Sequence, residues 1–146
     1  MRKRSFATLG ILAWLAAFSA FGQEKLRVDI PFEFHVANAV MPAGQYYVDQ
    51  SGRNIRNLLI LDCYACGAQA VALTFPAGGG SYVPTEGRLV FNKYGETYFL
   101  SEVWTPGNNF GMALSESRTE RELARTTLSH ARIALPVRKT VTLARR

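Results

Sequence analysis

Apolar and polar residues alternate strictly from Leu26 to Val36, and this is the clearest pattern in the chain. Alternation with a period of two is typical of a strand that buries one face, so residues 26–36 are predicted to form one strand. Pro31 has no N–H for a ladder hydrogen bond, which indicates an edge strand or an unpaired position there. The predicted core face consists of Leu26, Val28, Ile30, Phe32 and Phe34.

Further strands follow at short intervals, separated by turn residues. Met41-Pro42-Ala43-Gly44 and Asn92-Lys93-Tyr94-Gly95 both fit a type I turn that is closed by a bulge glycine. The segment Leu58-Leu59-Ile60-Leu61 is apolar on both faces, so its strand should lie in the middle of a sheet or under another layer. The predicted strands are 45–50, 55–62, 69–75, 88–92 and 97–104, with loops at 76–86 and 105–109.

The periodicity changes toward the C-terminus. Ser117-Arg118-Thr119-Glu120 is a capping box, so one polar surface helix is predicted from Ser117 to about His130. Pro136 should stop this helix, and a closing strand is expected from Val137 to Leu143. Two charge pairs support the helix, Arg118 with Glu122 and Glu122 with Arg125. Its apolar stripe would consist of Leu123, Ala124, Thr127, Leu128 and Ala131.

This order of elements predicts a mainly β fold, a small antiparallel β-barrel or sandwich with one C-terminal helix and a closing strand. Parallel βαβ units are excluded because no helix separates the predicted strands. A length of 146 residues is too short for a TIM barrel. A content of 48% hydrophobic and 12% aromatic residues argues against a disordered chain, and two cysteines are too few for a disulfide-dense scaffold.

The N-terminus resembles a secretory signal peptide. Arg2, Lys3 and Arg4 precede an apolar run, and Ala20-Phe21-Gly22 places small side chains where a signal peptidase would cut before Gln23. Residues 1–22 are therefore predicted to be a signal peptide and residues 23–146 a single exported domain, periplasmic or extracellular. The alternative is an uncleaved membrane anchor, for which the run is a little short.

The net charge of +6 is unevenly distributed. Half of it comes from Arg2, Lys3 and Arg4. Residues 23–114 carry a net charge of −2 and residues 115–146 a net charge of +5, so the remaining excess lies in the region from Arg118 to Arg146. Two interpretations of this basic region are open. It could contact anionic lipid or polysaccharide, or it could be a helix face and tail that are simply solvated, which is the commoner case. No nucleic-acid partner is expected, because no aromatic side chains are interleaved with the basic ones.

Three segments resemble a family of small uncharacterised exported proteins common in Acidobacteria and related Gram-negative soil bacteria. They are Ile30–Phe34 leading to Met41–Tyr46, Leu89–Leu100 up to Trp104, and Ser117–Ala124. The resemblance covers most of residues 23–146 and is most specific in the middle segment. It implies export and a compact, mainly β domain, and it implies no activity. Cys63-Tyr64-Ala65-Cys66 departs from the family pattern, which has a polar turn there.

Cys63 and Cys66 are the sharpest candidates for chemistry. A C-x-x-C redox site uses a helix N-terminus to lower the pKa of the first thiol, whereas here Gly67 and a predicted strand follow. Gly67 also occupies the place of the histidine in a haem-attachment motif, and no second cysteine pair completes a zinc site. The motif is therefore expected at a hairpin tip, either as a short-loop disulfide or as two free thiols, with a disulfide favoured by export.

Other candidates are weaker. The side chains of Asp29, Glu33 and His35 should share one face of a strand. They could hold a metal only with a further ligand from elsewhere in the chain, so a solvated strand face is the simpler interpretation. Gly78-Gly79-Gly80 is not followed by a helix, as a phosphate-binding loop would be, and no nucleophile elbow is present. No catalytic residue, cofactor-binding residue, metal ligand or cofactor is predicted.

The aromatic side chains allow two interpretations, a solid core or the lining of a cavity for an apolar ligand. The expected function is that of a non-enzymatic β-domain with a binding or structural role at the cell envelope. The alternatives are a barrel carrier of an apolar small molecule and a thiol–disulfide protein that uses Cys63 and Cys66. The aromatic set is Phe32, Phe34, Tyr46, Phe75, Phe91, Tyr98, Phe99 and Trp104.

Overall fold

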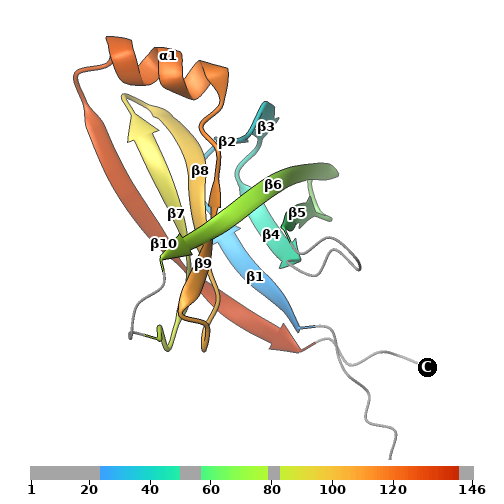
Figure 1. Cartoon of the computed structure of the whole chain (residues 1–146). Coiled ribbons are helices and arrows are strands. Elements are labelled where there is room, and N and C mark those ends of the chain that lie inside the picture. The colour runs from blue at the N-terminus through green and yellow to red at the C-terminus, as the bar shows by residue number, and fades with distance from the viewer. Residues whose placement is uncertain (1–23, 50–56, 79–82, 142–146) are drawn as a thin grey trace, which may run out of the picture.

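The fold is mainly β, as expected, with ten strands and one helix among the residues described by this computed structural model, 24–49, 57–78 and 83–141 (Figure 1). The elements are β1 (Glu24–Ile30), β2 (Phe34–Val36), β3 (Ala39–Met41), β4 (Gly44–Asp49), β5 (Leu58–Cys63), β6 (Ala68–Gly78), β7 (Gly87–Tyr94), β8 (Thr97–Trp104), β9 (Phe110–Leu114), α1 (Arg118–Thr126) and β10 (His130–Val141).

The strands form one mixed sheet in the order β3-β2-β8-β7-β10-β1-β4-β5-β6-β9. All neighbours are antiparallel except β2 and β8, which are parallel and meet at His35 and Phe99. β9 pairs with β6 and also with β8, where Glu102 is opposite Ala113. Figure 1 shows β6 crossing in front of β8 and β9, with α1 lying across one end of β7 and β8.

The core is made of side chains from strands that are far apart in the sequence. Phe34 contacts Tyr46 and Phe91 edge-to-face, with ring centroids 5.2 and 5.4 Å apart. The predicted apolar face of the first strand is confirmed, except that Phe32 is only partly buried. Core residues that are no more than 3% exposed include Leu26, Val28, Ile30, Phe34, Val36, Tyr46, Val48, Leu59, Leu61, Leu89, Phe91, Leu100 and Val103.

The first predicted strand is divided in two, which corrects the prediction of one strand over residues 26–36. β1 ends at Ile30 and β2 begins at Phe34. Pro31 starts the break because it cannot donate to a ladder. The division lets β1 pair with β4 and β10 while β2 pairs with β3 and β8.

One predicted bulge-glycine turn is wrong and the other is partly right. Gly44 lies in β4 opposite Ile30 and does not have a positive φ, because the tight turn occurs earlier, at Ala37 with φ 52°. The hairpin of β7 and β8 is confirmed, and Gly95 has the positive φ, 59°, that the turn requires. That turn lies two residues later than predicted, since β7 continues to Tyr94.

The C-terminal prediction needs two corrections. α1 ends at Thr126 rather than near His130, and β10 begins at His130 instead of Val137. Pro136 does not stop a helix but lies inside β10, opposite Arg88 of β7. Over residues 130–137, β10 pairs with β7, and its ladder with β1 starts only at Arg138. Pro136 therefore lies where β10 has one strand partner, and a strand edge of this kind tolerates a residue without an N–H.

Two short strands were not predicted at all. β9 falls directly after the predicted loop 105–109, and β3 falls in the predicted connection after residue 36. An alternation of Phe110, Met112 and Leu114 was the available signal for β9. Segments of three to five residues are difficult to recognise because periodicity needs more positions than they provide.

Several predictions fall on parts of the chain outside the described residues. These are the signal peptide 1–22, Gly79 and Gly80 of the glycine run, and residues 142–146 of the basic tail. Within the described residues, none of the helical segments combines the length and apolar character needed to cross a membrane.

Candidate functional site

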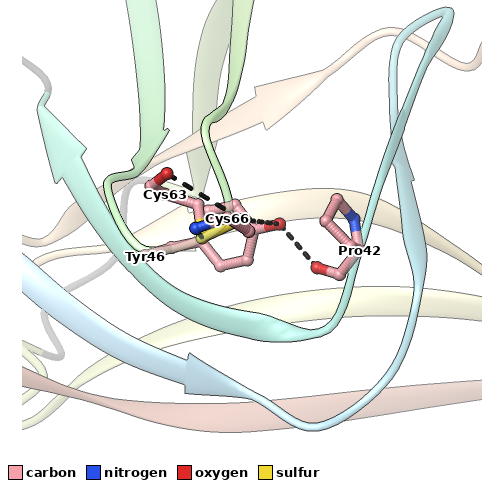
Figure 2. The surroundings of a disulfide bond; sticks show 4 residues. All are labelled: Pro42, Tyr46, Cys63 and Cys66. Carbon is pink, nitrogen blue, oxygen red and sulfur yellow. Dashed lines mark hydrogen bonds between the residues drawn. A yellow bond between two sulfur atoms is a disulfide. The ribbon is translucent and has the colours of Figure 1, made fainter.

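Cys63 and Cys66 form a disulfide at the tip of the hairpin of β5 and β6, so the structure selects the disulfide from the two alternatives (Figure 2). The backbone N–H of Cys66 donates to Cys63 Sγ over 3.2 Å. Cys66 Sγ lies 3.9 Å from the Tyr46 hydroxyl, which donates to the carbonyl of Pro42. Burial raises the pKa of the Tyr46 phenol.

The surroundings of the disulfide are those of a packed hairpin. Cys63 is buried, with 2% of its surface exposed, and a Cβ on Gly44 would lie only 3.3 Å from its Sγ. Cys66 is exposed, and Gly67 with φ 66° leads directly into β6. Because strands flank both cysteines, neither lies at a helix N-terminus of the kind that activates a thiol.

Replacing both cysteines by alanine is expected to keep the fold and to lower the free energy of unfolding by about 2 kcal/mol. The chain-entropy model gives this value for a loop of about four residues. Urea denaturation of the oxidised wild type and of Cys63→Ala/Cys66→Ala would measure the difference. A loss of native circular dichroism in the variant would contradict the prediction.

Asp29, Glu33 and His35 do not converge. The carboxylate of Asp29 accepts a hydrogen bond from Gln45, and Glu33 is exposed in the connection between β1 and β2. The ring of His35 stacks on Phe99, with centroids 4.7 Å apart. Among the residues that the structure describes, no three histidine, cysteine, aspartate or glutamate side chains gather as a metal site would require.

Both histidines of the chain belong to one aromatic row that crosses four strands. His35 stacks on Phe99, Phe99 contacts Tyr94 edge-to-face at 5.9 Å, and Tyr94 stacks on His130 at 4.8 Å. The row joins β2, β8, β7 and β10. The histidines lie at opposite ends of the row and therefore contribute packing at separate places.

Glu120 anchors α1 on the sheet and is the one residue that this helix buries. Ser117 Oγ accepts from the N–H of Glu120 over 3.1 Å, which confirms the predicted cap. The Glu120 carboxylate accepts from the backbone N–H of Ser117, which closes the predicted capping box, and also accepts from Asn92 Nδ2 over 2.9 Å. The predicted apolar stripe is wrong, since Leu128 is fully exposed and a carboxylate takes the buried place.

Burial raises the pKa of Glu120; the Asn92 hydrogen bond opposes this rise and nearby Glu116 adds to it. The unfolded chain therefore releases this proton at a lower pH than the folded chain. Between the two pKa values the folded state holds more protons, so stability falls as the pH rises through that window.

Glu120→Gln is expected to remove this fall in stability while keeping an acceptor for Asn92. The variant should gain stability relative to the wild type at pH 7, and the gain should shrink toward pH 4. Urea midpoints across this range would measure it, with Glu122→Gln at an exposed position of α1 as the matched control. Parallel pH profiles for Glu120→Gln and the wild type would contradict the assignment.

An apolar stripe runs along the outer face of β6. Val71, Leu73 and Phe75 are 54%, 65% and 55% exposed, whereas the alternate residues Ala70, Ala72 and Thr74 face the core. The neighbouring strand β5 places Ile60 and Leu58 opposite Val71 and Leu73, and both are partly exposed. The interpretation of Phe75 as a core aromatic is therefore wrong. We call Val71, Leu73 and Phe75 the β6 stripe.

Trp104 packs over two glycines, Gly78 of β6 and Gly111 of β9. A Cβ on Gly78 or Gly111 would lie 2.6 or 2.7 Å from the indole ring, so only glycine fits at either position. Trp104 Nε1 donates to Glu102 over 2.9 Å, and Arg132 binds the other carboxylate oxygen over 2.6 Å. Burial acts to raise the pKa of Glu102, but the bonds from Trp104 and Arg132 lower it below its usual value.

Three arginines of the basic region form a row on α1. Arg118, Arg121 and Arg125 line a shallow depression together with Glu122. The predicted pair of Arg118 with Glu122 is present, at 2.9 Å and with both side chains largely exposed. A pair in this setting contributes little to stability, so the row is a solvated helix face.

The sequence favoured the disulfide over two free thiols, and the structure has the disulfide. The sequence analysis missed the β6 stripe, although it recognised that Val71, Leu73 and Phe75 share a face. Alternation alone did not show that the smaller side chains of β6 face the core. Comparisons with protein-family models, with curated proteins and with solved structures gave no match.

Proposed function

We propose that the chain is an exported, non-enzymatic β-domain that acts by binding at the cell envelope through the β6 stripe. The stripe carries this proposal, because three large apolar side chains of one strand are each more than half exposed. Contiguous apolar surface of this kind generally marks an interaction site. A disulfide fits an oxidising compartment outside the cytoplasm and supports export.

We further propose that the sheet closes into a small, filled barrel. The support is that β9 pairs with β6 on one edge and with β8 on the other, which leads the strand order back to β8. Phe34, Leu59 and Phe91 are 0% exposed in its interior. Dense filling argues against the alternative of a hollow carrier for an apolar ligand.

The thiol–disulfide alternative is weaker for a structural reason. Cys63, the first cysteine of the motif and the usual attacking thiol, is buried, whereas Cys66 is the exposed residue of the pair. Strands β5 and β6 supply neither a helix dipole nor a cationic side chain next to Cys63. We therefore assign the disulfide to hairpin stabilisation.

The charges beside the stripe favour a basic protein partner over an anionic membrane. Asp49 is opposite Ile60, and Ile60 is opposite Val71, so the acid and the stripe share one face. Asp62 lies on the same face and accepts a hydrogen bond from Gln69 over 2.6 Å. Carboxylates next to an apolar strip attract lysine and arginine and repel anionic lipid headgroups. The expected partner is an envelope protein that presents an apolar segment flanked by basic side chains.

Binding of the purified protein to washed envelopes would test the proposal. Leu73→Lys should weaken binding at least tenfold, because it places a charge in the middle of the apolar contact. The matched control is Val40→Lys on β3, at a position that is 54% exposed and outside the stripe, and it should change binding less than twofold. Protease treatment of the envelopes should abolish binding, and intact-mass analysis of the envelope-associated chain should show a species that starts at Gln23.

Each opposite result contradicts part of the proposal. Equal binding of the wild type and Leu73→Lys would rule out the stripe. Undiminished binding to vesicles of phosphatidylglycerol, or to protease-treated envelopes, would replace the protein partner by a lipid or glycan surface. A mature species that starts at Met1 would overturn signal-peptide cleavage.

A further inference from the structure

We propose that Tyr47, Tyr64 and Asp62, on the outer face of β4 and β5, bind an arginine side chain of the partner protein. This inference rests on the proposed function, because it names where a basic side chain next to the partner's apolar segment binds. We call Tyr47, Tyr64 and Asp62 the tyrosine site. None of the three belongs to the β6 stripe, so the two surfaces can be tested separately.

The tyrosine site and the β6 stripe lie on one continuous surface of the sheet. Tyr47 of β4 is opposite Asp62 of β5, and Asp62 is opposite Gln69 of β6. Val71, the first residue of the stripe, follows Gln69 by two positions on the same strand. Side chains two positions apart on a strand are separated by about 7 Å. A partner that covers Val71 can therefore reach Asp62 with a neighbouring side chain.

The two rings of the tyrosine site contact each other and remain accessible. Their centroids are 5.3 Å apart and their planes are inclined by 59°. Tyr64 is 67% exposed and Tyr47 is half-buried, whereas the residues on either side of Tyr47, Tyr46 and Val48, are buried in the core. Aromatic faces attract cations, so two adjoining rings on the surface favour a cationic ligand.

Asp62 supplies the counter-charge for that cation. Gln69 donates to Asp62 Oδ1 over 2.6 Å, which orients the carboxylate, and Oδ2 can accept from a charged N–H donor. Among the described side chains, the charged ones on the outer face of β1, β4 and β5 are the acids Asp29, Asp49 and Asp62 and the base Arg27. This surface therefore has an excess of negative charge, which attracts a basic side chain.

A guanidinium group fits this arrangement better than an ammonium group. Its flat face can stack on a tyrosine ring while its edge donates N–H groups to a carboxylate. Tyr47 and Asp62 are direct neighbours across the ladder, and the Cβ atoms of such a pair are about 5 Å apart. One guanidinium can therefore contact both at the same time, which favours arginine over lysine.

The disulfide positions Tyr64 for this contact. Tyr64 lies in the turn between Cys63, which is buried, and Cys66, and the two cysteines close the loop around it. A closed loop has fewer accessible conformations than an open one. Because the ring is held beside Tyr47 before the ligand arrives, less conformational entropy is lost on binding. The disulfide thus contributes to binding in addition to stabilising the hairpin.

NMR titration of the isotope-labelled protein with N-acetyl-arginine methylamide would test the site without the partner. The matched probe is N-acetyl-citrulline methylamide, in which a neutral urea group of similar shape replaces the guanidinium. The arginine derivative should give saturable shifts at the amides of Tyr47, Asp62 and Tyr64, and the citrulline derivative should bind about fivefold more weakly or less. Equal affinities, or no saturable shift with the arginine derivative, would overturn the proposal. Tighter binding of N-acetyl-lysine methylamide would replace arginine by lysine.

Variants of the tyrosine site should weaken binding of the arginine derivative. Tyr64→Ala should weaken it about fivefold, and Tyr64→Phe, which keeps the ring, should recover most of this loss. Asp62→Asn, which keeps an acceptor for Gln69, should also weaken it about fivefold, because it removes the counter-charge. The matched control is Phe110→Ala on β9, at an aromatic position that is 50% exposed, and it should change binding less than twofold. Equal effects of Tyr64→Ala and Phe110→Ala would contradict the site.

The positioning role of the disulfide has its own test. Cys63→Ala/Cys66→Ala should keep native circular dichroism and bind the arginine derivative about threefold more weakly, because the turn is no longer closed. Unchanged binding in this variant would show that the disulfide does not position Tyr64.

Binding to washed envelopes separates this inference from the proposed function. Tyr64→Ala and Leu73→Lys should each weaken envelope binding. A loss with Leu73→Lys and none with Tyr64→Ala would keep the β6 stripe and overturn the role of the tyrosine site in partner binding. A loss with Tyr64→Ala and none with Leu73→Lys would overturn the stripe and keep the tyrosine site.

Discussion

Replacement of Phe34 by alanine is expected to lower the free energy of unfolding by about 3–5 kcal/mol. Phe34 is fully buried, and its ring contacts Tyr46 and Phe91 from β4 and β7. The three rings come from separate strands of one hydrogen-bonded sheet. The cavity that alanine leaves can therefore close only if paired strands move, so little of the lost packing is recovered.

Urea denaturation monitored by circular dichroism would measure this effect. Small domains are stable by about 5–15 kcal/mol in total, so the variant should unfold at a much lower urea concentration. Phe75→Ala is the matched control, because it removes the same side chain from a position that is 55% exposed. It should cost less than about 1 kcal/mol. Equal losses for the two variants would contradict the assignment of Phe34 to the core.

Gly111→Ala is expected to destabilise the protein by about 1–3 kcal/mol, although alanine differs from glycine by one methyl group. The added Cβ would lie 2.7 and 2.8 Å from two ring atoms of Trp104, which is closer than carbon atoms pack. The indole cannot easily move away, since Glu102 accepts its N–H and Arg88 lies 5.2 Å from its ring centroid. Relief requires β8 and β9 to separate.

A double-mutant cycle would show whether the indole causes the loss. Trp104→Leu removes the ring that the new methyl group meets, so Gly111→Ala should cost much less in the Trp104→Leu background. The four proteins would be compared by urea denaturation with circular dichroism as the signal. Additive effects of the two substitutions would mean that the contact between Trp104 and Gly111 does not limit the choice of residue at position 111.

The local patterns predicted the elements whose signal is complete within a few residues. The alternation from Leu26 onward identified the buried face of β1 and β2. Asn92-Lys93-Tyr94-Gly95 identified the hairpin of β7 and β8, because a positive φ at Gly95 is a requirement of the turn itself. Ser117 was recognised as the cap of α1, since capping involves only the first helical turn.

The predictions failed where the partner of a residue lies far away in the sequence. Pro136 was expected to end a helix, and its place in β10 depends on the ladder with β7. Glu120 closes the predicted capping box with Ser117, but its second partner, Asn92, lies 28 residues earlier and was not predicted. The β6 stripe was missed for the same reason, because the exposed face of β6 depends on which side chains of distant strands pack against its other face.

The sequence by itself determined that this chain is mainly β, which residues alternate on each strand, where α1 begins and that Cys63 and Cys66 lie close enough to join. These properties follow from backbone geometry and neighbouring side chains, which act over a few residues. Only the tertiary structure decided which face of β6 is exposed. Its small residues Ala70, Ala72 and Thr74 face the core and leave Val71, Leu73 and Phe75 outside. The physical reason is volume: the large rings of Phe34, Tyr46 and Phe91 occupy the interior, and a close-packed core has room for only small side chains opposite them.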